Sequence, residues 1–195
     1  MSDDLDHDAN VFGALALFVA DRMADAFAAT GEAVSPAAAL SALNQLLDRP
    51  SIDIIARAIG LTSSGTVRLV DKLEAAGFVT RGPGANDKRA TTIALTRSGR
   101  EAAERIAAAR LDVVRDALAT LDPADRDAFE RIGARLLVAL MRGPGATRWM
   151  CRLCDTDACG RSRGLCPVYN ESLARFGPNA RPWGSQGGAS PRRGS

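Results

Sequence analysis

The chain has 195 residues, of which 46% are hydrophobic and 25% are charged, and its formal net charge is +2. These values are typical of a soluble globular protein, and the net charge is too small to indicate a nucleic-acid partner by itself. The acidic start of the chain lacks the basic and apolar regions of a signal peptide, and no apolar run approaches the roughly 20 residues that span a bilayer. We therefore expect a cytoplasmic protein without membrane contact, in which cysteines are normally reduced.

The first elements are predicted to be helical. Residues 1–9 are rich in aspartate and are expected to form a flexible acidic N-terminus. From 11 to 30, apolar residues recur at every third or fourth position, which predicts a helix. The pair Ser35-Pro36 predicts the start of a second helix that extends to about Asp48, because serine caps helices and proline favours the first helical position.

A helix-turn-helix pattern follows. A short amphipathic helix is expected at 51–58, with a tight turn at Gly60. Thr62 or Ser63 then caps a further helix that extends to about residue 76. Two short helices joined by a glycine-containing turn form the helix-turn-helix pattern. The residues of the second helix that are expected to point inward are Thr66, Leu69, Val70 and Leu73.

A β-hairpin and two more helices complete the regular part of the chain. Short strands are predicted at 78–81 and 91–95, and the loop between them is rich in turn-forming and charged residues. Helices are predicted from 96 to about 120 and from 122 to about 141. The apolar stripes of these helices are wider than the core of one small module requires. They can belong either to a simple core or to a dimer interface. The inward residues of the last helix are expected to be Phe129, Ile132, Leu136, Leu137 and Leu140.

Charge is distributed unevenly along these elements. The first fifty residues carry a net charge of −6, whereas residues 51–100 carry +4. A basic middle beside an acidic segment is typical of a DNA-reading module on an acidic dimerisation scaffold.

The sequence resembles one known family of regulators. The segment Leu61 to Val79 resembles the recognition helix of MarR-family regulators, and Asp87-Lys88-Arg89 with the strand and helix start that follow resembles the wing signature of that family. The resemblance implies a mainly α-helical protein with a small β wing, a winged helix-turn-helix on a helical dimerisation scaffold. It also implies a dimer whose first and last helices intertwine. The domain would span about 10–142, with dimerisation helices at about 10–48 and 97–142 and the DNA-binding module at about 51–96.

The outward face of the recognition helix carries groups that can read DNA. Arginine can form two hydrogen bonds to guanine, serine can bond to bases or phosphates, and a valine methyl group can pack on a thymine methyl group. In the wing, Arg89 would enter the narrow minor groove, with Asp87 holding its guanidinium group in position. The candidate DNA-contacting residues are Ser63, Ser64, Thr66, Val67, Arg68, Lys72, Arg81, Asp87, Lys88 and Arg89.

These features predict a transcriptional regulator, expected to be a repressor that binds a pseudo-palindromic operator on double-stranded DNA as a homodimer. A winged-helix module that binds protein rather than DNA is the alternative from another class. The chain has one histidine, no nucleophile–base pairing and no glycine-rich phosphate loop, so we do not expect an enzyme. A small-molecule effector is expected in a cleft between scaffold and module, where the available polar anchors are Arg22, Asn44 and Gln45.

All four cysteines lie in a short segment near the end of the chain. They have the spacing C-x₂-C-x₄-C-x₆-C within a predicted metal-binding segment at 149–170. Four thiolates so close in sequence can converge on one metal centre. Disulfides are disfavoured in a reducing compartment, and zinc in a tetrahedral site is the expected cofactor. An iron–sulfur cluster that makes the protein a redox or iron sensor is the alternative, since a Cys-Pro pair ends ferredoxin-type runs. A thiol switch without metal is a third interpretation. The candidate metal ligands are Cys151, Cys154, Cys159 and Cys166.

The residues around the cysteines favour such a site. Gly160 and Gly164 allow the chain to wrap around a centre, and Arg152, Arg161 and Arg163 can offset the negative charge of four thiolates. From 177 to 195 the chain consists largely of Gly, Pro, Ser and Arg with little to bury, and it is expected to be disordered.

Overall fold

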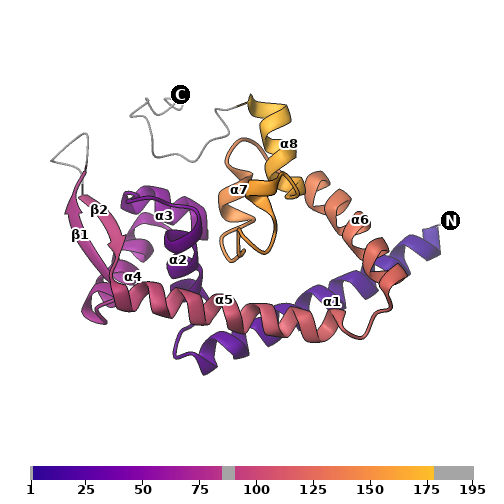
Figure 1. Cartoon of the computed structure of the whole chain (residues 1–195), viewed down its shortest axis with the longest axis horizontal. Coiled ribbons are helices and arrows are strands. Elements are labelled where there is room, and N and C mark those ends of the chain that lie inside the picture. Colours follow the sequence, from indigo (N-terminus) through magenta and orange to yellow (C-terminus); the bar gives the residue numbers. More distant parts are fainter. Residues whose placement is uncertain (1, 85–90, 178–195) are drawn as a thin grey trace.

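The computed structural model describes residues 2–84 and 91–177, and it is mainly helical with one small antiparallel sheet (Figure 1). This architecture confirms the predicted fold class. The elements are α1 (Ser2–Ala29), α2 (Val34–Gln45), α3 (Ile52–Ile59), α4 (Ser63–Ala75), β1 (Val79–Pro83), β2 (Thr91–Leu95), α5 (Arg97–Leu118), α6 (Pro123–Ala139), α7 (Ala146–Trp149), the 3₁₀ helix η1 (Arg161–Arg163) and α8 (Pro167–Phe176).

The main core lies where α2, α3, α4 and the hairpin pack against the first half of α5. The inward stripe predicted for α4 is confirmed, since all four of its residues are buried. In the hairpin, Val79 pairs with Leu95 and Pro83 with Thr91, which places Val79 and Ile93 in the core. The largest fully buried side chains of this core are Phe27, Leu40, Ile55, Val70, Ile93 and Ile106.

Three helix starts are fixed by side-chain caps at the predicted residues. The Oγ1 atom of Thr62 accepts a hydrogen bond from the Gly65 amide at 3.1 Å, and that of Thr96 accepts one from the Gly99 amide at 3.0 Å. Asp122 accepts one from the Asp125 amide at 2.8 Å. Each cap satisfies an amide that has no partner inside its helix.

The first two helices differ from their predicted bounds. The helix α1 begins at Ser2, so the residues expected to form a flexible N-terminus are helical from Ser2 onward. Aspartates near a helix N-terminus interact favourably with the helix dipole, and this explains why an acidic start can be helical. The helix α2 begins at Val34 after the uncapped Ala33 and ends at Gln45, because the chain turns there and the Leu46 and Leu47 amides both donate to the Ala42 carbonyl.

The long helices expose much of their apolar surface. Figure 1 shows α1 and α5 running side by side, while α6 turns away from α5. Residues of α6 and of the N-terminal half of α1 line one groove. The inward stripe predicted for α6 is wrong for the single chain: Phe129 is 49% exposed, Ile132 52% and Leu140 55%. No residue of α6 is buried, and among the described elements its main contact is with α8.

The C-terminal segment folds back onto the helical part of the chain. Gly143 and Gly145 adopt positive φ angles of 70° and 96° and end the α6 region. The helices α7 and α8 and the cysteine loop form a second small core with Met141, and they contact α3 and α6. Residues 178–195, for which disorder was predicted, lie outside the described part of the chain. Within the described ranges, no helix is both long and apolar enough to cross a membrane.

Candidate nucleic-acid interface

The first two turns of α4 present a polar face to solvent. Ser64, Val67 and Arg68 are exposed there, and Lys72 continues the same side of the helix one turn further on. Val67 is 41% exposed even though it is apolar. The opposite face of α4 is buried in the main core, so the helix is fixed in orientation while this face stays free for a partner. This is the arrangement that a recognition helix needs.

Two of the predicted contact residues form side-chain hydrogen bonds within the module. Thr66 is fully buried and its Oγ1 atom donates to the Thr62 carbonyl at 2.9 Å, so its assignment to DNA contact is wrong. Thr66 lies one turn after the cap, on the face of α4 that packs against the core. Ser63 is exposed, but its hydroxyl donates to the Asp53 carboxylate at 3.0 Å and thereby links α4 to α3.

The hairpin lies beside α4 and is held to it by a compact joint. Gly77 ends the α4 region with a φ angle of 75°, and its carbonyl accepts hydrogen bonds from Thr96 Oγ1 at 2.7 Å and Ser98 Oγ at 2.8 Å. The hairpin therefore leaves the core at a defined angle, as a wing beside a recognition helix does. The predicted wing contacts Asp87, Lys88 and Arg89 lie outside the described residues.

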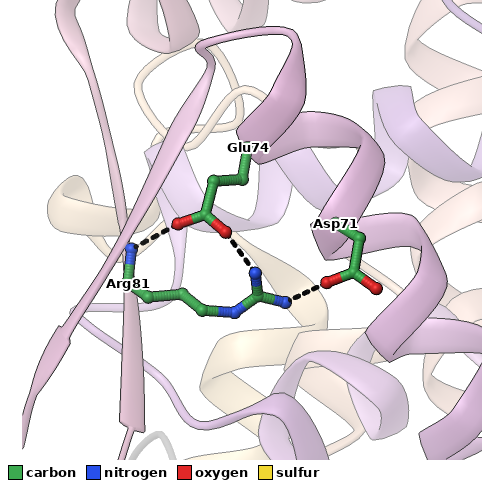
Figure 2. Close-up of polar contacts among 3 residues, drawn as sticks. All are labelled: Asp71, Glu74 and Arg81. Atoms are coloured by element: carbon green, nitrogen blue, oxygen red, sulfur yellow. Dashed lines mark hydrogen bonds and ion pairs between the residues drawn. The ribbon is translucent and has the colours of Figure 1, made fainter.

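Arg81 connects the wing to α4 rather than projecting toward a partner. Figure 2 shows its guanidinium group between Glu74 and Asp71 of α4. The Asp71 contact is 2.5 Å long, and the Arg81 amide also donates to Glu74 at 3.2 Å. The hydrogen bond to Asp71 is the main cause that raises the pKa of Arg81. These contacts hold the wing against α4, and the phosphate contact expected of Arg81 stays a prediction.

We expect Arg81→Ala to loosen the wing without unfolding the module. Ion pairs that are this exposed contribute little, so the free energy of unfolding should fall by no more than about 1 kcal/mol. Amide exchange in β1 should become about 3- to 10-fold faster, as measured by hydrogen exchange with mass spectrometry, whereas α3 should be unaffected. Arg97→Ala, which removes the exposed 3.0 Å pair between Arg97 and Glu101, is the control. Unchanged exchange in β1 would show that Arg81 does not position the wing.

The three polar anchors proposed for an effector do not converge. The Gln45 Oε1 atom accepts hydrogen bonds from the Thr156 hydroxyl at 2.6 Å and the Thr156 amide at 3.3 Å. Arg22 is exposed on α1, 3.8 Å from Asp25. A cavity of about 470 Å³ does lie beside Gln45, and it is lined by Leu46, Thr156, Asp157, Arg161, Ser162 and Tyr169. Only Gln45 of the three anchors lines it.

The four cysteines lie together as free thiols, and we call them the thiol cluster (Cys151, Cys154, Cys159 and Cys166). The Cys151 thiol interacts with those of Cys154 and Cys166, and Cys166 also interacts with Cys159. Contact with Cys151 lowers the pKa of Cys154 and of Cys166, and the same contacts raise the pKa of Cys151. No group of three or more His, Cys, Asp or Glu side chains in 2–84 and 91–177 is arranged to hold a metal ion as it stands.

One basic neighbour of the thiol cluster was missed by the sequence analysis. Of the three arginines expected to offset thiolate charge, Arg161 interacts with Cys154 and Cys166. Arg152 instead donates to the Trp149 carbonyl. Arg110 of α5 also acts on Cys154, although it lies 44 positions earlier in the chain. No pattern local to the cysteines could have indicated it, because only the folding back of the C-terminal segment brings the two together.

The fold and the site define a class of protein. Two short helices joined by a glycine turn, a β-hairpin beside the second helix and long flanking helices form a winged helix-turn-helix. Residues 34–90, from the start of α2 into the wing loop, match the model of the MarR family. The match covers the helix-turn-helix and the first part of the wing. No curated protein matches the chain.

Solved structures agree with this fold. The YusO protein from Bacillus subtilis has 21% sequence identity and a TM-score of 0.60, and the match covers 70% of this chain and 96% of that one. The MepR–DNA complex from S. aureus has 18% identity and a TM-score of 0.55, covering 68% and 97%. CouR from Rhodococcus jostii RHA1, bound to p-coumaroyl-CoA, has 21% identity and a TM-score of 0.53, covering 68% and 92%.

Proposed function

We propose that the protein is a MarR-family transcriptional regulator that binds double-stranded DNA as a homodimer and represses the genes it controls. The observation that carries the proposal is the exposed face of α4 beside the wing, within a module that matches the MarR family model over residues 34–90. A protein of the same fold, MepR, has been solved in complex with DNA.

Sequence reading would rest on the exposed residues at the start of α4. Arg68 is suited to form two hydrogen bonds to a guanine in the major groove, and Val67 offers methyl groups to a thymine. Ser64 and Lys72 would contact phosphates and fix the register of the helix on the duplex. The positive charge of residues 51–100 attracts the DNA backbone independently of sequence.

Dimerisation would cover the apolar surface that the single chain leaves exposed. An apolar groove of about 780 Å³ lies between α1 and α6, and its walls include Phe12 and Leu15 from α1 and Ile132 and Leu140 from α6. Soluble monomers rarely expose so large a contiguous apolar surface to water, and such surfaces usually mark interfaces. A second copy, contributing the same two helices, is the occupant that fits a self-complementary face of this kind. Such a dimer presents two α4 helices to successive major grooves of a pseudo-palindromic operator.

A small-molecule effector would act by changing the spacing of the two α4 helices. CouR, which shares the fold, has been solved with p-coumaroyl-CoA, so the scaffold is compatible with ligand binding. In this chain the cavity beside Gln45 is the candidate position, because it lies at the junction of α2 and the C-terminal segment.

The test is DNA binding by Arg68→Ala. An operator is first selected from random duplexes with the wild-type protein, and affinity is then measured by fluorescence anisotropy over a salt series. Loss of a bidentate base contact should weaken operator binding about 10- to 100-fold, with much less effect on a scrambled duplex. Arg131→Ala, an exposed substitution on α6, is the matched control and should change neither affinity.

The rival interpretation, a winged helix that binds only protein, makes an opposite prediction. A DNA-binding module must lose affinity steeply as salt rises, because bound phosphates release counterions. If no duplex is selected and the weak residual affinity is insensitive to salt, the proposed function is wrong.

A further inference from the structure

The thiol cluster is built from a loop that wraps around a common centre. Cys151 and Cys166 are buried at 7% and 6% exposure, and Cys154 and Cys159 pack against the same small core. The loop between them turns at Gly160 and Gly164, whose φ angles of 65° and 71° are left-handed. Four thiols from a span of 16 residues therefore face one another without any disulfide.

This small core is difficult to explain without a ligand. Its buried apolar side chains are few, namely Met141, Ala146 and Val168 beside the cysteines. A segment with so little to bury needs another source of stability, and a structural metal supplies it in many small cysteine-rich folds. We propose that the thiol cluster binds one zinc ion through four thiolates, and that this ion holds the C-terminal segment against α2 and α6.

The balance of charge is compatible with this proposal. Four thiols release four protons on binding Zn²⁺, which leaves a centre with a net charge of −2. Two guanidinium groups, those of Arg161 and Arg110, act on cysteines of the cluster. Arg161 is held in place by the ring of Tyr169, with its Cζ atom 4.3 Å from the ring centroid. Such neighbours tune and stabilise a charged metal centre.

The contacts between the thiols favour a single ion over a [4Fe–4S] cluster. Tetrahedral zinc with Zn–S bonds of about 2.3 Å brings its sulfurs to about 3.8 Å from one another, which is near contact. A [4Fe–4S] cluster places each cysteine on a different iron, so its cysteine sulfurs do not touch. Here Cys151 interacts with two other thiols and Cys166 with two. Thiols that already interact in this way therefore suit one zinc ion better than a [4Fe–4S] cluster.

The cysteine loop contacts both α2 and the main core, and the following helix α8 contacts α6, so an ion in the loop would connect these parts of the fold. Thr156, within the cysteine loop, donates to Gln45 at the end of α2, and Leu153 packs against the main core. On the other side, α8 contacts α6. A metal-closed loop would therefore join the winged module to α6. Removal of the ion should release this connection.

The experiment measures metal in the full chain purified anaerobically without added metal. Plasma mass spectrometry should find about one zinc per chain in the wild type, and in Ser162→Ala, an exposed substitution in the same loop. Cys159→Ser should hold less than about a tenth as much zinc, because three thiolates bind it more weakly. Cobalt added to protein stripped of metal should give the visible bands of tetrahedral thiolate-bound Co²⁺ in the wild type and in Ser162→Ala, but not in Cys159→Ser.

A second measurement guards against a variant that does not fold. Stripping the wild-type protein with a chelator should accelerate amide exchange in 151–176 at least about tenfold, and added zinc should restore protection, while α4 stays unchanged. Iron with inorganic sulfide in place of zinc, or a wild type with no bound metal that takes up none, would overturn the proposal. So would equal exchange in 151–176 with and without zinc. None of these outcomes depends on DNA binding.

Discussion

Ile132→Glu is expected to dissociate the protein into monomers and to weaken operator binding at least about 100-fold. Ile132 is 52% exposed in the single chain and lines the apolar groove between α1 and α6. In a symmetric dimer the substitution appears twice, and each carboxylate would lose its water without gaining a partner. The loss of about 3 kcal/mol or more in the dimer is enough for a 100-fold effect.

The same substitution should leave the monomer folded, because the side chain is not part of either core. Sedimentation velocity at several concentrations reports the oligomeric state, and far-ultraviolet circular dichroism reports the helix content. Operator affinity falls because a monomer holds only one half-site and loses the high effective concentration of the second. Arg135→Glu, exposed on the same helix but outside the groove, is the control for adding negative charge. A wild type that is monomeric at all concentrations, or an Ile132→Glu dimer, would contradict the proposed interface.

The helix starts and the hairpin were accessible from sequence because each depends on short-range chemistry. Thr62, Thr96 and Asp122 cap the helices at which they were predicted, since a cap requires only one side chain and an amide three residues on. The inward stripe of α4 and the pairing of the two strands follow from spacing in the same way. In these parts of the fold, a pattern of neighbouring residues is enough to predict the local structure.

Features that depend on partners distant in the sequence could not be predicted in this way. Periodicity identified the apolar stripe of α6 but could not show that the stripe lies outside the chain's own core. Arg81 was assigned to phosphate because a basic residue on a wing often binds DNA, yet the two carboxylates that hold it lie one element away on α4. Gln45 was assigned to a ligand, but its partner is Thr156, 111 positions along the chain. For Arg81 and Gln45, the residue type indicated which kind of polar contact the side chain can form, but only the folded structure shows which group it contacts.

Gly99→Ala is expected to lower the free energy of unfolding by about 3 kcal/mol, at the upper end of the usual range for overpacking. A Cβ atom at this position would lie 1.9 Å from the Phe78 carbonyl oxygen and 2.9 Å from its carbonyl carbon. That oxygen is not free to move away, because it accepts hydrogen bonds from the Thr96 amide at 2.9 Å and from the Thr96 hydroxyl at 3.2 Å. The first turn of α5 must therefore shift, and with it the cap that Thr96 provides to Gly99.

The expected result is a thermal midpoint lower by about 6–12 °C, measured at a fixed protein concentration so that dimerisation contributes equally. Gly82→Ala is the matched control in the same hairpin: its Cβ atom would meet no atom within 4 Å, and its stability should be unchanged or raised by about 0.5 kcal/mol. Because the wing leaves the core at this joint, Gly99→Ala should also weaken operator binding at temperatures where the protein remains folded. If both glycine variants melt like the wild type, the close approach of α5 to Phe78 does not constrain the wing, and its orientation must depend mainly on the contact of Arg81 with α4.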